Sequence, residues 1–408
     1  KEKKMKKLIA FAVALLFLSV TGIAAAIDVQ MSGEYYVRGT YQKNADGDGA
    51  LHASDESGTM YYDHEFDLNL NWKIDDNTII FSQFEMRDDT WGTNRAAEDN
   101  VGDEPDDNIV AEKVYVWHKF ANGHETKLGL MSGGEWGTSF HDAAGDVYRV
   151  RYDIPTDAVR IIGILEKAAE SSDMSNGQGE SADVDKYILG LLTKLGPINF
   201  KPLFVYVNGG NTYDALVSYL AFDGTFGNIG FESEFGVSDK DYESAATTNS
   251  RTYGAYANVW YASGPVKAGI LGAFGTYDAD ADTAHGFGGD FDAGGAMIIG
   301  VDGGFGFNKS TGVVADTLAG GRLAALYADY DVSDKLSVGG YAGFAKCGID
   351  LGQWDGAKAW EVSADATYKI TDNIVYDLGA GVAQLKYGGD TANPDRAFKL
   401  FHKLTVNF

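Results

Sequence analysis

Apolar and polar residues alternate one by one over long stretches of this chain, and this alternation limits its fold more than any other feature. In the segment 360–370, "WEVSADATYKI", one parity is apolar and the other is polar. The apolar parity consists of Trp360, Val362, Ala364, Ala366, Tyr368 and Ile370. Successive side chains of a β-strand point to opposite faces, so a period of two indicates strands with one apolar face. The chain is therefore predicted to be all-β.

Eighteen strands are predicted, joined by connections that alternate between short turns and long polar loops. An even number of antiparallel strands returns both termini to the same side of a sheet. The predicted strands are 28–41, 60–73, 78–90, 110–120, 125–132, 146–153, 157–167, 184–195, 198–207, 213–223, 226–237, 250–262, 265–277, 318–331, 336–346, 358–370, 374–387 and 396–408. The weakest parts of this assignment are 146–167, which could belong to an infolded loop, and 278–317, which could hide another hairpin.

A soluble β-sandwich also has alternating strands, but three features favour a membrane barrel. The apolar faces begin or end with Tyr, Trp or Phe, as the interfacial girdles of membrane barrels do. The strands have about 10 to 14 residues, near the length that a tilted strand needs to cross a bilayer. Short turns on one side and long loops on the other complete the pattern. We therefore predict a transmembrane antiparallel up-and-down β-barrel with short periplasmic turns and long extracellular loops.

The composition agrees with this prediction, although the mean hydropathy of −0.20 is that of a soluble protein. The 52 Gly and 6 Pro suit strands with many turns. Long loops rich in Asp, Gly, Ser and Asn lower the average, and only one face of each strand would meet lipid. A low mean hydropathy therefore does not exclude a membrane barrel.

The first residues resemble a secretory signal peptide. A basic start precedes the apolar run 8–20, and Ala24 and Ala26 form a small-residue cleavage site. A membrane anchor is the alternative, but the run is short for a spanning helix. We assign 1–26, with a short upstream extension, to the signal peptide and 27–408 to the barrel domain.

The net charge and the cysteine and histidine content argue against several classes of function. The formal net charge of −26 argues against nucleic acid as a partner. Cys347 is the only cysteine, so the chain cannot form an internal disulfide. None of the seven His forms a recognisable nucleophile–base pattern with Ser, so we do not expect an enzyme.

Two short motifs resemble bacterial outer-membrane proteins. Phe408 ends an alternating apolar face, which resembles the C-terminal signature that the outer-membrane barrel assembly machinery recognises. The segment "RVRYDIP" at 149–155 resembles the "SVRYDSP" segment of general Gram-negative porins, and differs from it at Ile154. The resemblance implies a Gram-negative outer-membrane location, contact with outer-membrane lipid and lipopolysaccharide, and a homotrimer. That family usually has 16 strands, which leaves 16 as the alternative to the count of 18.

In that family a loop folded into the lumen forms the constriction, and we expect 133–146 to do so here. The acidic constriction residues would be Glu135, Asp142 and Asp146, and the basic ones Arg149, Arg151 and Arg160. Acid facing base across a narrow lumen orders water and disfavours bulky apolar solutes. The alternative is that these arginines only balance carboxylates within the wall.

Other polar residues on the lumen parity would line a water-filled interior, because a barrel of this width cannot fill itself with side chains. The predicted lumen-lining residues are Glu34, Arg38, Lys73, Glu85, Arg87 and Lys127.

An acidic loop raises the question of metal binding. Asn44, Asp46, Asp48 and Asp55 fall at positions 1, 3, 5 and 12 of an EF-hand-like calcium loop, but Asn and Asp replace the usual end ligands and no helices flank it. A solvated loop that binds divalent cations loosely is the simpler interpretation. We expect no cofactor.

These features predict a porin for passive diffusion of ions and small hydrophilic solutes. The negative net charge favours a weak preference for cations, which salt screening reduces. The alternative is a substrate-selective channel for sugars or organic acids, which would need an aromatic slide or a basic ladder along the lumen.

Overall fold

The computed structural model describes most of the predicted barrel domain. The described residues are 28–44, 58–91, 109–138, 140, 142–169, 183–210, 212–243, 249–276, 294–299, 320–348, 355–388 and 392–408. The predicted signal peptide at 1–26 and the predicted calcium ligands Asp46, Asp48 and Asp55 lie outside them.

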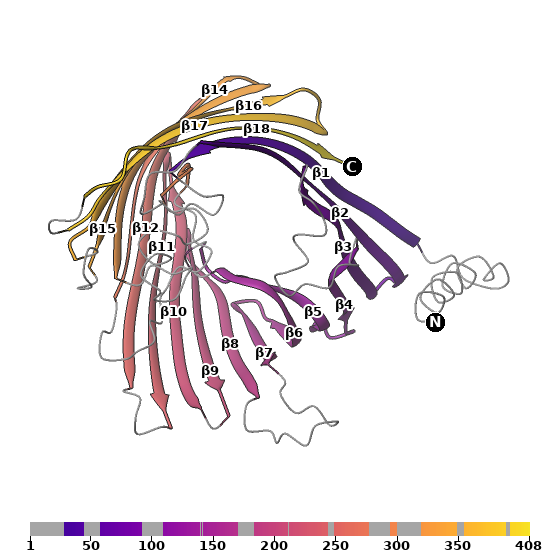
Figure 1. The fold of residues 1–408 in the computed structure, drawn as a ribbon. Coiled ribbons are helices and arrows are strands. Elements are labelled where there is room, and N and C mark those ends of the chain that lie inside the picture. The colour runs from indigo at the N-terminus through magenta and orange to yellow at the C-terminus, as the bar shows by residue number, and fades with distance from the viewer. Residues whose placement is uncertain are drawn as a thin grey trace, which may run out of the picture.

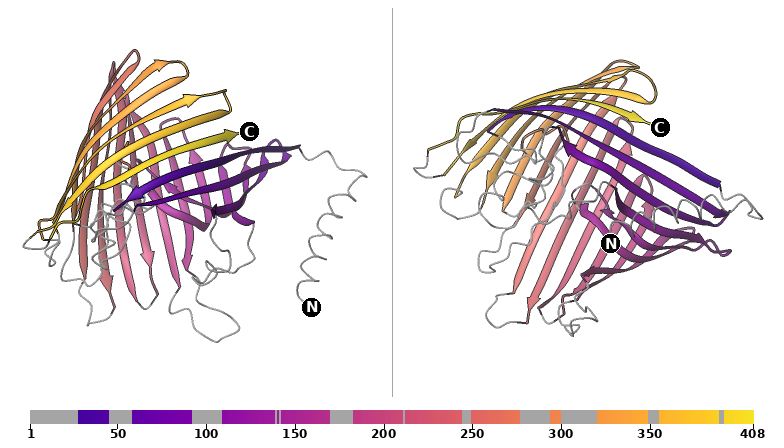
Figure 2. Two further views of the ribbon diagram at one scale, coloured as in Figure 1. Left: turned by 45° about the horizontal axis from the view of Figure 1, so that its top comes forward. Right: turned by 45° about the vertical axis from the view of Figure 1, so that its right-hand side comes forward.

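In the described residues, eighteen antiparallel strands form one sheet that closes on itself through the pairing of β1 with β18 (Figures 1 and 2). The prediction of an all-β up-and-down barrel with 18 strands is confirmed, and the alternative of 16 is wrong. The strands are β1 (Asp28–Lys43), β2 (Thr59–Asp75), β3 (Thr78–Thr90), β4 (Val110–Lys119), β5 (Glu125–Glu135), β6 (Asp142–Pro155), β7 (Val159–Ala169), β8 (Val184–Leu195), β9 (Ile198–Asn208), β10 (Tyr213–Phe226), β11 (Ile229–Tyr242), β12 (Ser250–Ser263), β13 (Val266–Gly275), β14 (Gly321–Ser333), β15 (Leu336–Cys347), β16 (Lys358–Lys369), β17 (Ile374–Lys386) and β18 (Ala397–Asn407).

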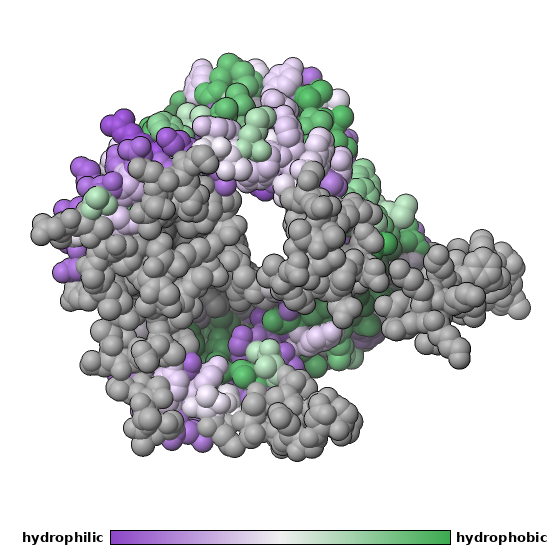
Figure 3. All heavy atoms as spheres, in the orientation of Figure 1, coloured by the Kyte–Doolittle hydropathy of each residue, from purple (hydrophilic) through white to green (hydrophobic). Residues whose placement is uncertain are grey.

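The alternation in the sequence separates the outer face from the lumen. On β16, Val362 is 51% exposed and Tyr368 is 45% exposed on the outer face, whereas Glu361 and Ser363 point inward and are buried. The outer surface carries apolar side chains on every side of the barrel, and Figure 3 shows them over the outside of the ring. A closed sheet pairs all its backbone groups internally, so a barrel with an apolar outer band is suited to a bilayer.

No helix in the described residues is long and apolar enough to cross a membrane.

Two details of the strand prediction differ from the structure. The predicted break between the strands 213–223 and 226–237 is misplaced, because β10 continues to Phe226 and the chain turns at Gly227 and Asn228. Gly227 has a φ of +61°, a left-handed conformation that glycine adopts without strain. The strand β6 begins at Asp142 and not at 146, and 146–167 belongs to the wall through β6 and β7. Of the segment 278–317, only 294–299 is described, and it contains no strand.

The C-terminus takes part in closing the barrel. The backbone of Phe408 exchanges two hydrogen bonds with Gly33, of 2.9 and 3.1 Å, and its ring stacks on Phe66 with centroids 5.7 Å apart. Gly33 has no room for a side chain, because a Cβ would collide with the Phe408 ring and the carbonyl of Asp67. The terminal residue therefore locks the first and second strands to the last.

We expect Phe408→Ala to lower the free energy of unfolding by about 2 kcal/mol, because an aromatic pair and partial burial are lost. Phe226→Ala is the matched control, because Phe226 is equally exposed at another turn and stacks on Phe231. Both variants should lower the urea midpoint of the folded barrel, but only Phe408→Ala should slow insertion in cells, followed by heat-modifiable gel mobility. Equal insertion of the two variants would contradict an assembly role of Phe408.

Candidate functional site

The segment after β5 folds into the lumen and attaches to strands farther along the wall. The indole Nε1 of Trp136 donates to the carbonyl of Lys201 on β9 at 3.0 Å, and Lys201 Nζ donates to the carbonyl of Gly137 at 2.9 Å. Thr138 donates from its backbone N and its Oγ1 to Glu234 on β11, at 2.9 and 2.7 Å. The segment 136–140 thus spans the inner face from β5 to β11.

Two glycines make room for this segment. A Cβ at Gly190 on β8 would collide with the Trp136 ring, and one at Gly137 would collide with Ala221 on β10. The close approach fixes the position of the indole against the inner wall.

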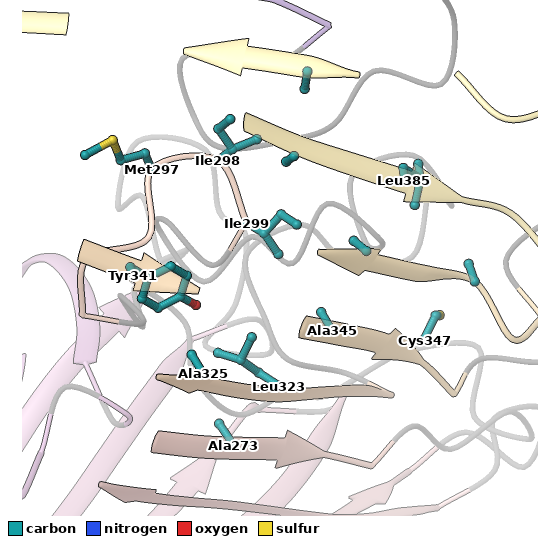
Figure 4. Close-up of a cluster of buried hydrophobic side chains, with 14 of the residues drawn as sticks. Ala273, Met297, Ile298, Ile299, Leu323, Ala325, Tyr341, Ala345, Cys347 and Leu385 are labelled. Carbon is teal, nitrogen blue, oxygen red and sulfur yellow. The ribbon is translucent and has the colours of Figure 1, made fainter. Parts of the chain in front are cut away.

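A second segment, 294–299, is held at the inner face of β16 by one carboxylate. Glu361 is buried and accepts hydrogen bonds from the backbone N of Met297, Ile298 and Ile299, at 2.7, 3.2 and 2.6 Å. Ser363 adds a hydrogen bond to the carbonyl of Gly295 at 2.9 Å. Figure 4 shows Met297, Ile298 and Ile299 on this loop among side chains of the wall strands.

The two segments share one apolar cluster, so they narrow the lumen from the same side. The ring of Phe140 stacks on Tyr256 of β12, with centroids 6.1 Å apart. Ile298 and Leu323 belong to the same cluster of buried residues. In the orientation of Figure 1, the space-filling view in Figure 3 still leaves an open passage through the ring.

The wall formed by β5 to β8 concentrates positive charge in the lumen. Glu166 is the centre of one group: Arg149 reaches it at 2.6 Å and Lys186 at 2.7 Å. Asp153 is the centre of a second group: it pairs with Arg151 at 2.8 Å and with Arg160 at 2.6 Å. We call five of the cations on these strands the basic wall: Lys127, Arg149, Arg151, Arg160 and Lys186.

Only three carboxylates balance the five cations. Arg160 also reaches Glu125 at 3.0 Å, and Lys127 lies over the Tyr115 ring at 5.4 Å from its centroid. With Asp153 and Glu166, this leaves the basic wall with two positive charges in excess. Its charge is fixed by the sheet, because all these residues stand on paired strands.

A cavity of about 190 Å³ lies between the basic wall and the infolded segment. Arg149, Arg151, Lys186 and Glu166 supply its charged side, so three cations face one carboxylate there. Its other side is apolar and consists of Trp136, Ile164, Ile188, Leu203, Val205, Val207, Val217 and Tyr219. Cations next to an apolar surface can bind a solute that has a negative group on a hydrophobic body.

Carboxylates of β14, β16 and β17 gather on the side of the ring across from β5–β8 (Figure 1), and one carboxylate of β11 lines the same cavity. We call Glu232, Asp329, Asp365 and Asp377 the acidic wall; together they line a cavity of about 600 Å³. Lys267 and Lys403 line the same cavity, so the acidic wall keeps an excess of two negative charges. The two walls polarise the lumen across its width.

The structure brings together the basic residues expected at the constriction but not their expected acidic partners. Arg149, Arg151 and Arg160 all belong to the basic wall. Asp146 is part of β6 and lies 3.8 Å from Lys113, because the strand begins before it. Glu135 and Asp142 pair through their backbones where β5 meets β6, and their side chains are outside the described part.

The residues that were predicted to line the lumen lie apart from one another. Arg38 pairs with Asp63 at 2.8 Å, Lys403 lies 3.8 Å from Glu34, and Lys73 pairs with Asp76 at 2.9 Å beside a short turn. Glu85 stands opposite Asp67 in the β2–β3 register, and the side chain of Arg87 is not described. Lys127 alone joins the basic wall.

Sequence reasoning missed Lys186 and Glu166, and in the acidic wall it missed Asp329 and Asp377. Lys186 and Glu166 are direct cross-strand neighbours, and both stand on the lumen parity of their strands. The sequence indicates that parity for each strand separately. It does not give the register of β7 against β8, which places the two side chains next to each other.

The calcium-loop prediction stays a prediction. Asn44, its first residue, donates from its side-chain amide to the carbonyl of Arg396 at 3.2 Å. Within the described ranges, no group of three His, Cys, Asp or Glu residues could hold a metal ion.

Among known proteins, no family model matches the chain, and no curated protein matches it in sequence. Solved structures match in fold. The Pseudomonas aeruginosa outer membrane protein OpdK aligns with a TM-score of 0.55 and 11% identity over 93% of this chain and 99% of its own. OccK9 (OpdG) from the same organism aligns with a TM-score of 0.57 and 14% identity over 93% of this chain and 99% of its own. OccK2 (OpdF), also from Pseudomonas aeruginosa, aligns with a TM-score of 0.58 and 9% identity over 93% of this chain and 98% of its own.

At this identity the likeness is one of fold. The closed sheet with its apolar outer band is thus a β-barrel with the fold of these Pseudomonas outer-membrane proteins.

Proposed function

We propose that this barrel is a substrate-selective outer-membrane channel for small organic acids, those with a carboxylate on a ring in particular. The observation that carries the proposal is the cavity of about 190 Å³ between the basic wall and Trp136. Arg149, Arg151 and Lys186 can pair with the carboxylate, while the apolar side receives the ring. The excess of positive charge on this wall leaves donors for a solute after the internal ion pairs are made.

The neighbours in fold support this class of solute. OpdK has been crystallised with vanillate, and OccK2 with glucuronate. Both ligands are carboxylates that carry a ring. The sequence of this chain differs from theirs at most positions, with identities of 11% and 10%, so the support is for the class of ligand and not for either compound.

A general diffusion pore with a weak cation preference is the second candidate. The acidic wall offsets the basic wall, and the formal net charge of the chain is −26. A lumen whose opposite walls cancel would pass small hydrophilic solutes of either sign with little selection.

Planar-bilayer recording of the purified full chain separates the candidates. Benzoate should block the current in a saturable way, with half-block at about 0.1–1 mM, the affinity expected of a few charge-assisted contacts. Benzyl alcohol is the control with the same ring and no charge, and it should block far less. Equal effects of benzoate and benzyl alcohol, with a reversal potential that favours cations in a salt gradient, would support the diffusion pore instead.

A further inference from the structure

Four basic residues form an unbroken row on the outer face of the barrel. Arg322, Lys346, Lys358 and Lys386 are direct cross-strand neighbours, each paired in register with the next on β14, β15, β16 and β17. All four are exposed and stand at the ends of their strands that lead into long connections. Adjacent strands are about 4.8 Å apart, so the row is about 14 Å long.

Contacts within the barrel do not explain this row. Like charges directly opposite each other destabilise a sheet. In the described part of the chain, the side chain of none of the four forms an ion pair or a hydrogen bond. Elsewhere on the same rim, outward-facing cations are paired, as Arg251 is with Asp239 and Lys167 with Asp185 at 2.9 Å. The row therefore offers four positive charges to a partner outside the chain.

The depth of the row indicates that this partner is a lipid headgroup. Two residues farther along each strand, toward the middle of the bilayer, the next row of the outer face consists of Ala324, Phe344, Trp360 and Gln384. Aromatic rings at this level mark the boundary between the headgroups and the hydrocarbon. The guanidinium of Arg396 lies 5.9 Å from the centroid of the Trp360 ring and adds a fifth cation at the same boundary.

The outer surface beside the row is hollowed. A cavity of about 820 Å³ is lined in part by the small outward-facing residues Ala255, Ala257 and Gly272, with Phe274 and Arg322 toward the long loops. Small side chains in this sector leave space for an acyl chain below a headgroup held by Arg322.

We propose that this row is a binding site for the phosphorylated headgroup of lipopolysaccharide in the outer leaflet. Long loops of such barrels face the outside, where this lipid presents several phosphates on one headgroup. A row about 14 Å long with four charges matches a ligand with more than one phosphate better than a single phosphodiester. The site is on the outside of the barrel and does not depend on the proposed channel function.

The test compares two triple variants of the full chain in detergent. K346Q/K358Q/K386Q removes the lysines of the row, and K194Q/K335Q/K369Q removes three exposed lysines at the short-turn end. Titration with lipopolysaccharide should give a dissociation constant that is roughly a hundredfold higher for the first variant only, because each lysine near an anionic lipid surface contributes about fivefold. Native mass spectrometry should find co-purified lipopolysaccharide on the parent and the control.

Three further probes identify the ligand. Dephosphorylated lipopolysaccharide, phosphatidylglycerol and inorganic phosphate should each bind the parent more weakly than lipopolysaccharide does. If the triple variant does not assemble, each single variant should weaken binding about fivefold. Equal affinity of parent and row variant, an equal loss in the short-turn control, or undiminished binding of dephosphorylated lipopolysaccharide would overturn the proposal. Tight binding of inorganic phosphate alone would overturn the assignment to a lipid.

Discussion

Replacing Glu361 with alanine is expected to release the segment 294–299 and widen the channel. The buried carboxylate accepts three backbone N–H groups, and hydrogen bonds to a charged acceptor contribute about 1.5–3 kcal/mol each. Without the acceptor, three buried donors lose their partner, at a cost of roughly 5 kcal/mol. The packing of Ile298 and Ile299 in the apolar cluster opposes release by a similar amount at most.

Single-channel conductance in a planar bilayer measures this effect. We expect the conductance of Glu361→Ala to rise by roughly half or more, because conductance follows the open cross-section. Glu361→Gln keeps one acceptor oxygen and should give an intermediate value. Ser363→Ala is the control, because it removes only the hydrogen bond to Gly295. Parent-like conductance and noise in Glu361→Ala would mean that packing alone holds the segment.

The second large effect is expected at the basic wall. The triple variant R149Q/E166Q/K186Q removes two cations together with the carboxylate between them, so no buried charge is left without a partner. Two charge-assisted contacts to a solute are lost, which corresponds to about 3 kcal/mol, or roughly a hundredfold in the dissociation constant. Half-block by benzoate should move from the submillimolar range to tens of millimolar or more.

Glu166→Gln alone is the matched control for this variant. It removes the carboxylate and keeps both cations, so benzoate should block at least as well as in the parent. Each variant should show the conductance of the parent when benzoate is absent, which verifies that it still forms the channel. If benzoate blocks both variants as it blocks the parent, the solute does not bind between the basic wall and Trp136, and the proposed selectivity fails.

The sequence was sufficient to predict the strands, because side-chain direction in a strand depends only on parity. On β16, the apolar parity became the outer face and the polar parity became the lumen, as Val362 and Ser363 demonstrate. The position of the turn after β10 was less certain, because both Gly224 and Gly227 suit a turn and only the pairing of Phe226 with Ile229 decides between them.

The partners inside the lumen could not be predicted in the same way. Glu361 has the parity of any lumen-lining carboxylate, and the groups that it binds lie more than 60 residues away in the sequence. Asp146 was expected to face the arginines because it ends the segment 133–146, which was predicted to fold inward. It belongs to the wall instead, since β6 already begins at Asp142, and its cation is Lys113 of β4. Such contacts depend on the closure of the sheet and on loop paths that local patterns do not encode.

The way in which Glu361 holds the segment 294–299 also affects how freely the inner lining can vary. The carboxylate binds backbone N–H groups, which every residue except proline supplies. Substitutions at the neighbouring positions 294 and 296, which line the lumen cavity, can therefore alter the chemistry of the passage while the backbone attachment and the buried packing of 297–299 stay unchanged. The same barrel can therefore hold inner segments of different sequence. Related channels can differ in the solutes that they admit, and an engineered sensing pore can be given a new lining, without redesign of the strands.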